Sequence, residues 1–246
     1  MNPVAFELFG MEIRWYGIIM ACAIITAVLL AMRNARKMGL SEDVIADIAL
    51  WGIPGGVIGA RLYYVIFEWS SYQGDIWAML NIRAGGLAIH GGIIGGVLLG
   101  GGYVLLKKHP FWKYADVAAI SLIIAQAIGR WGNFMNNEAH GGPTDLPWGI
   151  LVDGQRVHPT FLYESLWNLG VFAFLMWYNP RKKADGEVFC LYLALYSLAR
   201  VFIEGLRTDS LMLGPLRVAQ LASLLLIAAG LALRWILIKR QGARSQ

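Results

Sequence analysis

The sequence has few charged residues. Charged side chains make up 15% of its 246 residues, whereas about 25% is usual in a soluble domain. Hydrophobic residues make up 57%, and the mean hydropathy is +0.54. These values exclude a disordered chain, a coiled coil and most soluble enzymes. They indicate a polytopic membrane protein, for which the placement of the basic residues matters more than the net charge of +5.

Cysteine is also scarce. Cys22 and Cys190 lie in apolar runs far apart and offer neither a disulfide framework nor the spacing of zinc ligands. We expect both to be buried small hydrophobic residues and neither to be a nucleophile. His90, His140 and His158 also lack metal-ligand spacing, and no nucleotide-binding motif is present. We therefore expect no metal and no cofactor.

Long apolar runs make up most of the chain. A membrane helix needs about 20 mainly apolar residues. Seven such runs cover residues 15–32, 44–67, 86–106, 115–131, 159–178, 187–206 and 216–238. The sequence thus predicts an all-α, polytopic integral membrane protein with seven transmembrane helices, forming a single transmembrane domain over residues 1–246.

Lysine placement predicts the orientation of these spans. All lysines fall in alternate loops or in the C-terminal tail, which the positive-inside rule assigns to the cytoplasm. They are Lys37, Lys107, Lys108, Lys113, Lys182, Lys183 and Lys239. The N-terminus is then outside and the C-terminus cytoplasmic. No basic stretch precedes the first apolar run, so we expect it to remain as an anchor rather than to be cleaved as a signal peptide.

The longest predicted outside loop covers residues 132–158, between the fourth and fifth spans. Loops longer than about 12–15 residues are often functional. The stretch Gly141–Gly142–Pro143 predicts a turn within it. Its polar residues include Asn133, Asn136, Asn137, Glu138, His140, Asp145 and Asp153. This extracytoplasmic loop region is therefore a candidate for function.

Ionisable side chains gather at one depth in the predicted spans. Charges inside a bilayer are costly and are candidates for function. Counted from the outer ends, Arg61, His90, Glu164 and Arg200 fall about 6–9 Å inside, and Arg130 lies at the outer surface. The inner halves of the same spans carry almost none. This asymmetry predicts a polar cavity that opens to the outer leaflet or outer surface.

Each of these residues also has a plainer explanation. Arg61 can pair with a carboxylate such as Glu164 as structural support. Arg200 and Glu204 can form an intrahelical ion pair, and His90 can be a satisfied histidine. Glycines that repeat every four residues fit close helix packing, or they leave room for a bulky ligand beside His90. They are Gly52 and Gly56 in the second run and Gly92, Gly96 and Gly100 in the third.

Residues 129–141, GRWGNFMNNEAHG, form the most distinctive motif. This stretch closely resembles the signature of the bacterial prolipoprotein diacylglyceryl transferase family, G-R-x-G-N-F-x-N-x-E-x-x-G, at every specified position. Phe161 departs from the family pattern, which has glutamine there. Other stretches similar to family motifs are Arg14–Trp15–Tyr16–Gly17, His90–Gly91–Gly92, His158–Pro159–Thr160, Leu162–Tyr163–Glu164, and the spacing of Tyr196, Arg200, Glu204 and Arg207. The resemblance covers nearly the whole chain and implies the same seven-span order.

The resemblance implies transfer of a diacylglyceryl group from phosphatidylglycerol to the lipobox cysteine thiol of a prolipoprotein. The products are a thioether-linked lipoprotein and glycerol phosphate, in the first step of lipoprotein maturation. The implied partners are phosphatidylglycerol, the prolipoprotein signal peptide and membrane lipid, with no nucleic acid. The implied location is the inner (cytoplasmic) membrane of a bacterium, with the active site facing the outer leaflet.

The implied chemistry suggests roles for the polar residues. Guanidinium groups stay charged and bind phosphate oxygens bidentately, so Arg130 is expected to hold the lipid phosphate and Arg200 to stabilise the departing one. His90 is the expected base for the acceptor thiol, whose reference pKa is about 8.5, with Tyr196 and Glu204 as weaker candidates. The alternative, in which Arg200 lowers the thiol pKa and His90 binds the phosphate, stays open.

Further residues are expected to bind substrate. Asn133 and Glu138 either bind the glycerol head group or position Arg130, and Gly141 permits a tight turn. The other substrate-binding candidates are Tyr16, Glu204 and Arg207. Loop structure alone is the alternative for Asn133, Glu138 and Gly141.

A secondary transporter for an anionic solute is the main alternative function. Arginines within the membrane and glycine-broken helices fit such a protein. Against it, the polar residues lie in one leaflet, no inverted repeat is visible, and the inner half offers no polar exit path. A non-catalytic scaffold would not explain several arginines at one depth.

Overall fold

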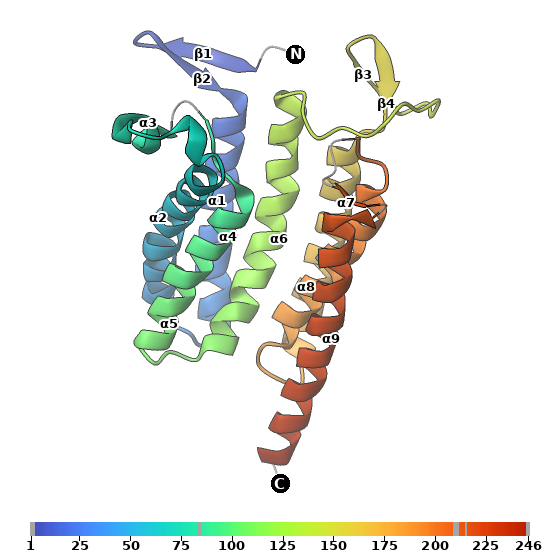
Figure 1. Ribbon diagram of the computed structural model, residues 1–246. Helices are drawn as coiled ribbons and strands as arrows, with labels where there is room; N and C mark the ends of the chain where they lie inside the picture. The colour runs from blue at the N-terminus through green and yellow to red at the C-terminus, as the bar shows by residue number, and fades with distance from the viewer. Residues whose placement is uncertain (1–2, 83–84, 209–211, 215, 245–246) are drawn as a thin grey trace. The chain divides into compact units, whose positions relative to one another are not determined.

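A computed structural model describes residues 3–82, 85–208, 212–214 and 216–244, and most of them are helical (Figure 1). Helices satisfy their backbone hydrogen bonds internally, as a bilayer requires. The long helices are α1 (Trp15–Lys37), α2 (Glu42–Phe67), α6 (Phe111–Met135), α7 (Thr160–Tyr178), α8 (Glu187–Glu204) and α9 (Val218–Arg244). A further helical run consists of α4 (Ile89–Gly96), a π-helical turn η3 (Val97–Gly101) and α5 (Gly102–Leu106).

Each predicted apolar run coincides with one of these helices or with the run from α4 to α5. Within the described residues, five segments are long and apolar enough to cross a membrane, namely α1, α2, the run from α4 to α5, α6 and α9. Helices α7 and α8 form where expected but fall outside that set, and each buries a carboxylate, Glu164 in α7 and Glu204 in α8. Large apolar side chains point outward along the spans; Leu50 of α2 is 65% exposed and Leu225 of α9 is 71% exposed. The chain is therefore a mostly helical membrane protein.

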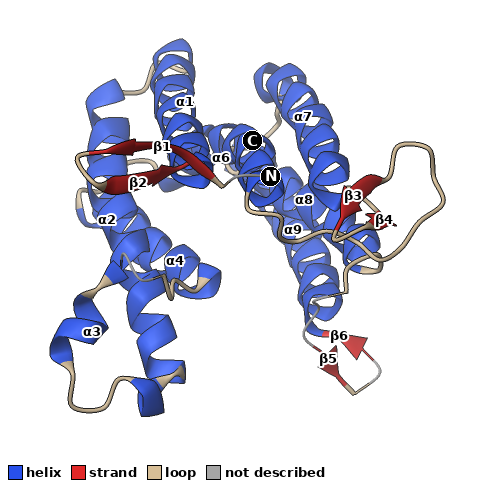
Figure 2. Cartoon of the chain, turned by 90° about the horizontal axis from the view of Figure 1, so that it is seen from above, coloured by secondary structure: helices blue, strands red, loops and turns tan. Residues whose placement is uncertain are grey.

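Short elements join the helices. Between α2 and α4 lie η1 (Trp69–Ser71) and α3 (Ile76–Leu80), and η4 (Asn179–Arg181) follows α7. Figure 2 shows antiparallel hairpins in red. They are β1 (Val4–Leu8) with β2 (Met11–Arg14), β3 (Ile150–Val152) with β4 (Gln155–Val157), and β5 (Met212–Leu213) with β6 (Leu216–Arg217). The hydropathy pattern predicted none of these strands, because none is longer than five residues.

The chain forms two compact units. The first comprises Met1–Ala31 and Ala115–Gln246, and the second comprises Met32–Tyr114. A core cluster in the first unit lies between α6, α7 and α8, and its members are Ala119, Ile120, Ile123, Val171, Leu175, Val188 and Tyr192. Cys190 is buried, as expected, but Cys22 is exposed, because it lines a groove rather than this core. The expectation that Cys22 is buried was therefore wrong.

An ionic network ties together one end of the first unit; we call it the inner network. Asp116 of α6 accepts hydrogen bonds from Lys182 Nζ at 2.6 Å and from the backbone N–H groups of Gly186 and Phe189, each at 2.9 Å. Glu187 of α8 accepts from Tyr178 Oη, Arg234 Nε and the backbone N–H of Lys183, at 2.6, 2.8 and 2.7 Å. Both carboxylates are fully buried. Every carboxylate oxygen has a donor, as buried charge requires, so the network holds the α7–α8 connection against α6 and α9.

The second unit depends on glycine. Helices α2 and α4 approach so closely that a Cβ atom on Gly55, Gly59, Gly91 or Gly95 would lie less than 3 Å from backbone atoms of the facing helix. Close backbone contact through small residues is a common way to pack helices in membranes. The packing explanation of the glycine repeats is confirmed. The two helices come closest at glycines that lie one residue before those of the predicted repeat. A Cβ atom on Gly52 or Gly96, by contrast, would lie 3.6 or 3.4 Å from the nearest atom of the facing helix.

Candidate active site

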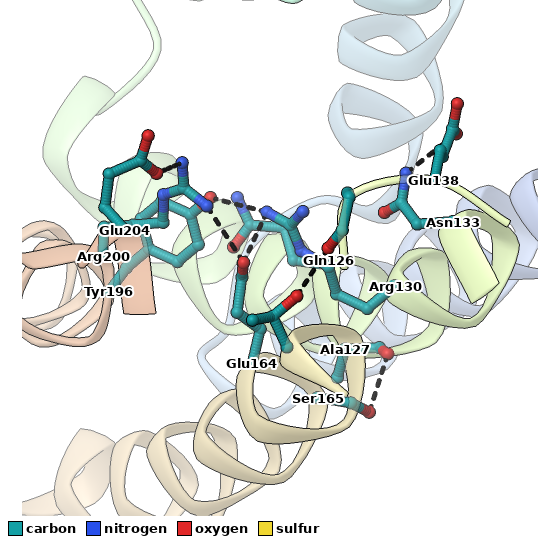
Figure 3. A network of polar contacts seen from close by, with 12 residues as sticks. Gln126, Ala127, Arg130, Asn133, Glu138, Glu164, Ser165, Tyr196, Arg200 and Glu204 are labelled. Atoms are coloured by element: carbon teal, nitrogen blue, oxygen red, sulfur yellow. Dashed lines mark hydrogen bonds and ion pairs between the residues drawn. The ribbon is translucent and has the colours of Figure 1, made fainter. Parts of the chain in front are cut away.

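Three helices of the first unit bring charged side chains to one place. Arg130 lies in the last two turns of α6, Glu164 lies in the second turn of α7, and Arg200 lies in the second-last turn of α8. Consecutive helices joined by loops run in opposite directions, so the end of α6, the start of α7 and the end of α8 meet. Figure 3 shows the side chains converging.

Glu164 bridges the two arginines. Its Oε2 atom lies 2.6 Å from Arg130 Nη2, and its Oε1 atom accepts a hydrogen bond of 2.9 Å from Arg200 Nη1. The Glu164 side chain is only 3% exposed. A buried carboxylate is tolerated only where cations compensate it. Because one carboxylate faces two guanidinium groups, it holds them at a fixed separation.

Two further side chains complete this group, which we call the outer network. Arg200 Nη2 donates to Glu204 Oε2 at 2.5 Å, one turn along α8. Tyr196 Oη, one turn earlier on the same helix, accepts a hydrogen bond of 3.4 Å from Arg130 Nη2. The intrahelical pair of Arg200 and Glu204 thus exists, but Arg200 also reaches another helix. With two guanidinium and two carboxylate groups ionised, the formal charges of the outer network cancel.

Both arginines have guanidinium N–H groups that are not used by the contacts described above. A guanidinium carries five N–H donors. Among the described residues, the contacts of Arg130 involve Nη2 alone and those of Arg200 involve Nη1 and Nη2. Their side chains remain 20% and 17% exposed. Both can therefore accept an anionic ligand without breaking every existing contact.

Neutral hydrogen bonds hold α6 and α7 in register beside the outer network. Ser165 Oγ donates to the carbonyl oxygen of Ala127 at 2.9 Å, and it accepts from Trp131 Nε1 at 3.1 Å. Ser165 follows Glu164, and Trp131 follows Arg130. These bonds therefore fix the two residues that form the Arg130–Glu164 ion pair.

An apolar groove of about 260 Å³ involves two of the three helices that carry the outer network, together with α1. Its lining residues belong to α1, α6 and α7, and they are Trp15, Ile18, Ile19, Cys22, Ala127, Ile128, Trp131, Ser165 and Leu169. Ile128 and Trp131 come from the turn that carries Arg130. An apolar groove on the helix turn that carries Arg130 suits a ligand that combines an anionic group with a hydrocarbon chain.

Tyr16 packs on the helix that carries Arg130. A Cβ atom on Gly132 would lie 2.9 Å from the Tyr16 ring, so the missing side chain makes room for this ring. Asn133 and Glu138 contact each other rather than Arg130. Asn133 Nδ2 donates to Glu138 Oε1 at 3.0 Å, and the Glu138 N–H donates to the Asn133 carbonyl at 3.0 Å. They close the turn after α6.

Gly141 serves a different need from the one the sequence suggested. It is not among the described residues with positive φ, and it forms an antiparallel bridge with Arg207 rather than a turn. A Cβ atom there would lie 2.6 Å from His158 Cβ. The expectation of a tight turn was wrong. Glycine is required here because the loop passes so close to His158 that a side chain would not fit. Arg207 lies just beyond the end of α8 and pairs this loop to it.

His90 and Arg61 belong to the second unit. His90 lies at the start of α4, where its exposed ring is 6.0 Å from the ring of Tyr63, and within the described part of this unit no hydrogen bond to the His90 ring is recorded. The ring contact with Tyr63 leaves the satisfied-histidine explanation open. Pairing of Arg61 with a carboxylate was one of the explanations that the sequence allowed, but the partners of its guanidinium in the described part of this unit are backbone carbonyls. Arg61 donates hydrogen bonds of 2.7–2.9 Å to the backbone carbonyls of Ala78, Met79, Gly85 and Gly86. Arg61 therefore fixes the segment between α2 and α4 of its own unit.

Sequence reasoning placed Glu164 in the layer of ionisable residues but gave it no specific role, and it did not single out Ser165. Its depth in the predicted span placed Glu164 near the arginines. However, no charged residue close to it in the sequence indicated which residue it pairs with. The signal that could have found it is the motif at the start of the fifth span, which includes Tyr163 and Glu164. Ser165 carries no sequence signal that we can identify.

Proteins of known name match nearly the whole chain in sequence. The family model described as prolipoprotein diacylglyceryl transferase matches residues 3–236. The phosphatidylglycerol–prolipoprotein diacylglyceryl transferase of Clostridioides difficile (strain 630) is 53% identical over 240 residues, covering 98% of this chain and 97% of that protein. The proteins of the same name from Finegoldia magna and from Nostoc sp. are each 47% identical; the matches cover 100% and 98% of this chain, and 99% and 91% of those proteins. The chain belongs to the bacterial prolipoprotein diacylglyceryl transferase family.

Proposed function

We propose that this protein transfers the diacylglyceryl group of phosphatidylglycerol to the lipobox cysteine thiol of prolipoproteins. The observation that carries the proposal is the convergence of Arg130 and Arg200 on Glu164. The names of relatives that match nearly the whole chain support the same reaction. The transporter alternative is not favoured, because these relatives are named as transferases.

The proposed setting is the cytoplasmic (inner) membrane of a bacterium, with the whole chain acting as one transmembrane domain. Helices α7 and α8 would also cross the bilayer, giving seven spans with the N-terminus outside. Lysine placement supports this orientation. Within the first unit, Lys182 lies in the inner network, where it binds Asp116, and Arg130 lies in the outer network. Asp116 and Arg130 are both on α6, and their positions put them about 21 Å apart along that helix. The site would then face the outer leaflet, and the 132–158 loop region would cover it.

The reaction exchanges one bond for another. The thiolate sulfur attacks the glyceryl carbon that carries the phosphate oxygen, a carbon–sulfur bond forms, and the carbon–oxygen bond breaks. The electron pair of the broken bond stays on the phosphate, which leaves as glycerol phosphate. The thiol proton passes to a base. Negative charge therefore grows on the phosphate, and guanidinium groups in a partly buried site stabilise it.

The two arginines divide this work in the proposal. Arg130 holds the phosphodiester through donors that its Glu164 contact leaves unused, and Arg200 stabilises the leaving phosphate. Glu164 aligns both side chains before the lipid arrives, and the apolar groove receives part of its hydrocarbon. Because the charges of the outer network cancel, an anion binds there favourably only through the N–H groups that are still unused. Bidentate geometry matters because it lets one guanidinium donate two such bonds.

His90 is the proposed base, because its ring is exposed at the start of α4 and histidine is the side chain that most often serves as a general base. Tyr196 and Glu204 stay as weaker candidates, and the exchange of roles between His90 and Arg200 stays open. For the remaining residues we propose substrate contact or support. They are Tyr16, Asn133, Glu138, Gly141 and Arg207.

The test is a defined assay with purified protein, phosphatidylglycerol vesicles and a lipobox peptide. We expect the thioether-linked peptide and one equivalent of glycerol phosphate, and we expect Arg200→Lys to lose most of this activity despite keeping its charge. Arg156→Lys is the matched control, because Arg156 is exposed in β4 and outside the network. Solute flux without thioether formation would favour the transporter instead. An Arg200→Lys enzyme with normal turnover would refute the bidentate role.

A further inference from the structure

The tip of the β1–β2 hairpin has an unusual residue for its backbone. Leu8 pairs with Met11, so Phe9 and Gly10 form a two-residue loop, and their φ angles are +50° and +76°. Positive φ at both positions is the type I′ pattern, which favours asparagine, aspartate or glycine. Gly10 fits this geometry. A bulky aromatic residue such as Phe9 is a genuine outlier there.

A second hairpin of the same unit supplies the comparison. Val152 pairs with Gln155, and the loop residues Asp153 and Gly154 have φ angles of +48° and +81°. The backbone is nearly the same, but the first loop residue is aspartate, one of the favoured types. The turn itself therefore does not require phenylalanine. Strain of this kind is a pointer to a functional contact of the residue that bears it.

The hairpin is amphipathic, and its apolar side is uncovered. Phe9 is 92% exposed, and Phe6, Leu8 and Met11 are 43–51% exposed. Phe6 pairs with Ile13 and Leu8 with Met11, so these side chains share one face, whereas the pair Glu7 and Glu12 lies on the other. An apolar face with an aromatic tip and an acidic opposite face fits the boundary between lipid and water.

The hairpin is joined directly to α1, and this connection determines what lies beside the apolar face of the hairpin. Strand β2 ends at Arg14 and α1 begins at Trp15, without a linker, and the Trp15 N–H donates to the carbonyl of Pro3 at 3.0 Å. Helix α1 is one of the segments that can cross a membrane. The hairpin runs crosswise to α1 at that end of the helix (Figure 1). This geometry fits a hairpin that lies along the membrane surface.

We propose that the β1–β2 hairpin is a membrane-surface anchor whose tip residue, Phe9, inserts into the lipid at the head-group and acyl-chain boundary. Amphipathic elements bury their apolar face about 5–10 Å into this boundary. The occupant is lipid rather than a protein partner, because the hairpin is joined directly to a span. The anchor fixes the depth of Trp15 and of Tyr16, which packs on Gly132 beside Arg130. It thereby holds the outer end of α1 level with the lipid head groups.

The test measures the depth of the loop in full-length protein reconstituted into phosphatidylglycerol-containing vesicles. A fluorophore is attached to Phe9→Cys in a Cys22→Ala background, where the buried Cys190 stays unreactive. Asp153→Cys is the matched control, because it occupies the same position of the other turn. We expect the Phe9 label to be quenched by lipids spin-labelled near the top of the acyl chain and to be shielded from aqueous iodide. The Asp153 label should show the reverse.

Equal iodide quenching at both positions would overturn the proposal. Protection of the Phe9 label that appears only when a lipobox peptide is added would also overturn it, in favour of substrate docking. A second variant separates anchoring from folding: Phe9→Asn should relieve the turn and leave the thermal midpoint in detergent unchanged or higher. In the Phe9→Asn protein, a fluorophore attached at Met11→Cys should be quenched less by the spin-labelled lipids than the same fluorophore in a protein that keeps Phe9. Retained quenching would show that Phe9 does not drive insertion.

Discussion

The first unit contains two ionic networks that use the same chemistry for different ends. In the inner network, the carboxylates of Asp116 and Glu187 accept from backbone N–H groups as well as from Lys182 and Arg234. In the outer network, Glu164 and Glu204 meet guanidinium groups and, among the described residues, no backbone donor. The inner network therefore fastens chain to chain, whereas the outer one aligns two cations and leaves them spare donors. Burial of charge alone does not distinguish structure from function; the identity of the partners does.

The largest expected effect concerns activity at the outer network. Arg130→Lys keeps the charge but loses the planar fork, so we expect kcat/KM for thioether formation to fall about a thousandfold, in the range known for loss of a key oxyanion donor. The thermal midpoint should change little, because lysine can still pair with Glu164. Comparable activity of this variant and the Arg156→Lys control would place Arg130 among structural residues.

The matching change in the inner network should act on stability instead. Asp116→Ala leaves Lys182 and two backbone N–H groups without their acceptor, so we expect unfolding to become easier by about 3 kcal/mol. A thiol-reactive dye on a Cys22→Ala protein can follow this, because Cys190 is buried until the protein unfolds. Turnover of the folded variant at low temperature should match the parent. A specific loss of kcat there would end the contrast between the networks.

Glu164→Gln should sharpen the comparison within the outer network. Glutamine keeps the shape and one acceptor, but it removes the charge that both guanidinium groups share. We expect kcat to fall about tenfold, because the arginines lose alignment, while KM for phosphatidylglycerol stays equal or falls, because the network gains net positive charge. Separate kcat and KM values from lipid titrations provide the check. A higher KM with unchanged kcat would contradict a positioning role.

The smallest effect is expected at Ser165. Ser165→Ala removes the hydrogen bonds to Ala127 and from Trp131, so we expect a loss of about 1 kcal/mol in stability and less than about a twofold change in rate. Thermal unfolding and initial rates measured side by side provide the check. A rate loss close to that of Glu164→Gln would mean that the neutral bonds, rather than the shared carboxylate, set the arginine geometry.

Much of the helical framework follows from local sequence. The apolar runs predicted the long helices with ends displaced by a few residues, because hydropathy depends on the residues of each run alone. The largest displacements are at the C-terminal ends of α9 and α1, which continue to Arg244 and Lys37, because polar and basic residues beyond an apolar run can still be helical. The β1–β2 and β3–β4 hairpins escaped prediction, since their strands are too short for a clear alternating pattern.

The sequence alone determined that this is a membrane protein, that its helices follow in this order, and that the 129–141 motif belongs to a transferase family. These properties are local, so each is written in one stretch of chain. Only the tertiary structure decided that Glu164 joins Arg130 to Arg200, that Arg61 binds carbonyl groups, and that Gly141 is needed for close packing. Those contacts join residues far apart in the chain, such as Glu164 and Arg200, which are separated by 36 positions, and no local pattern encodes them. They depend on how antiparallel helices bring their ends together, which is a property of the folded chain.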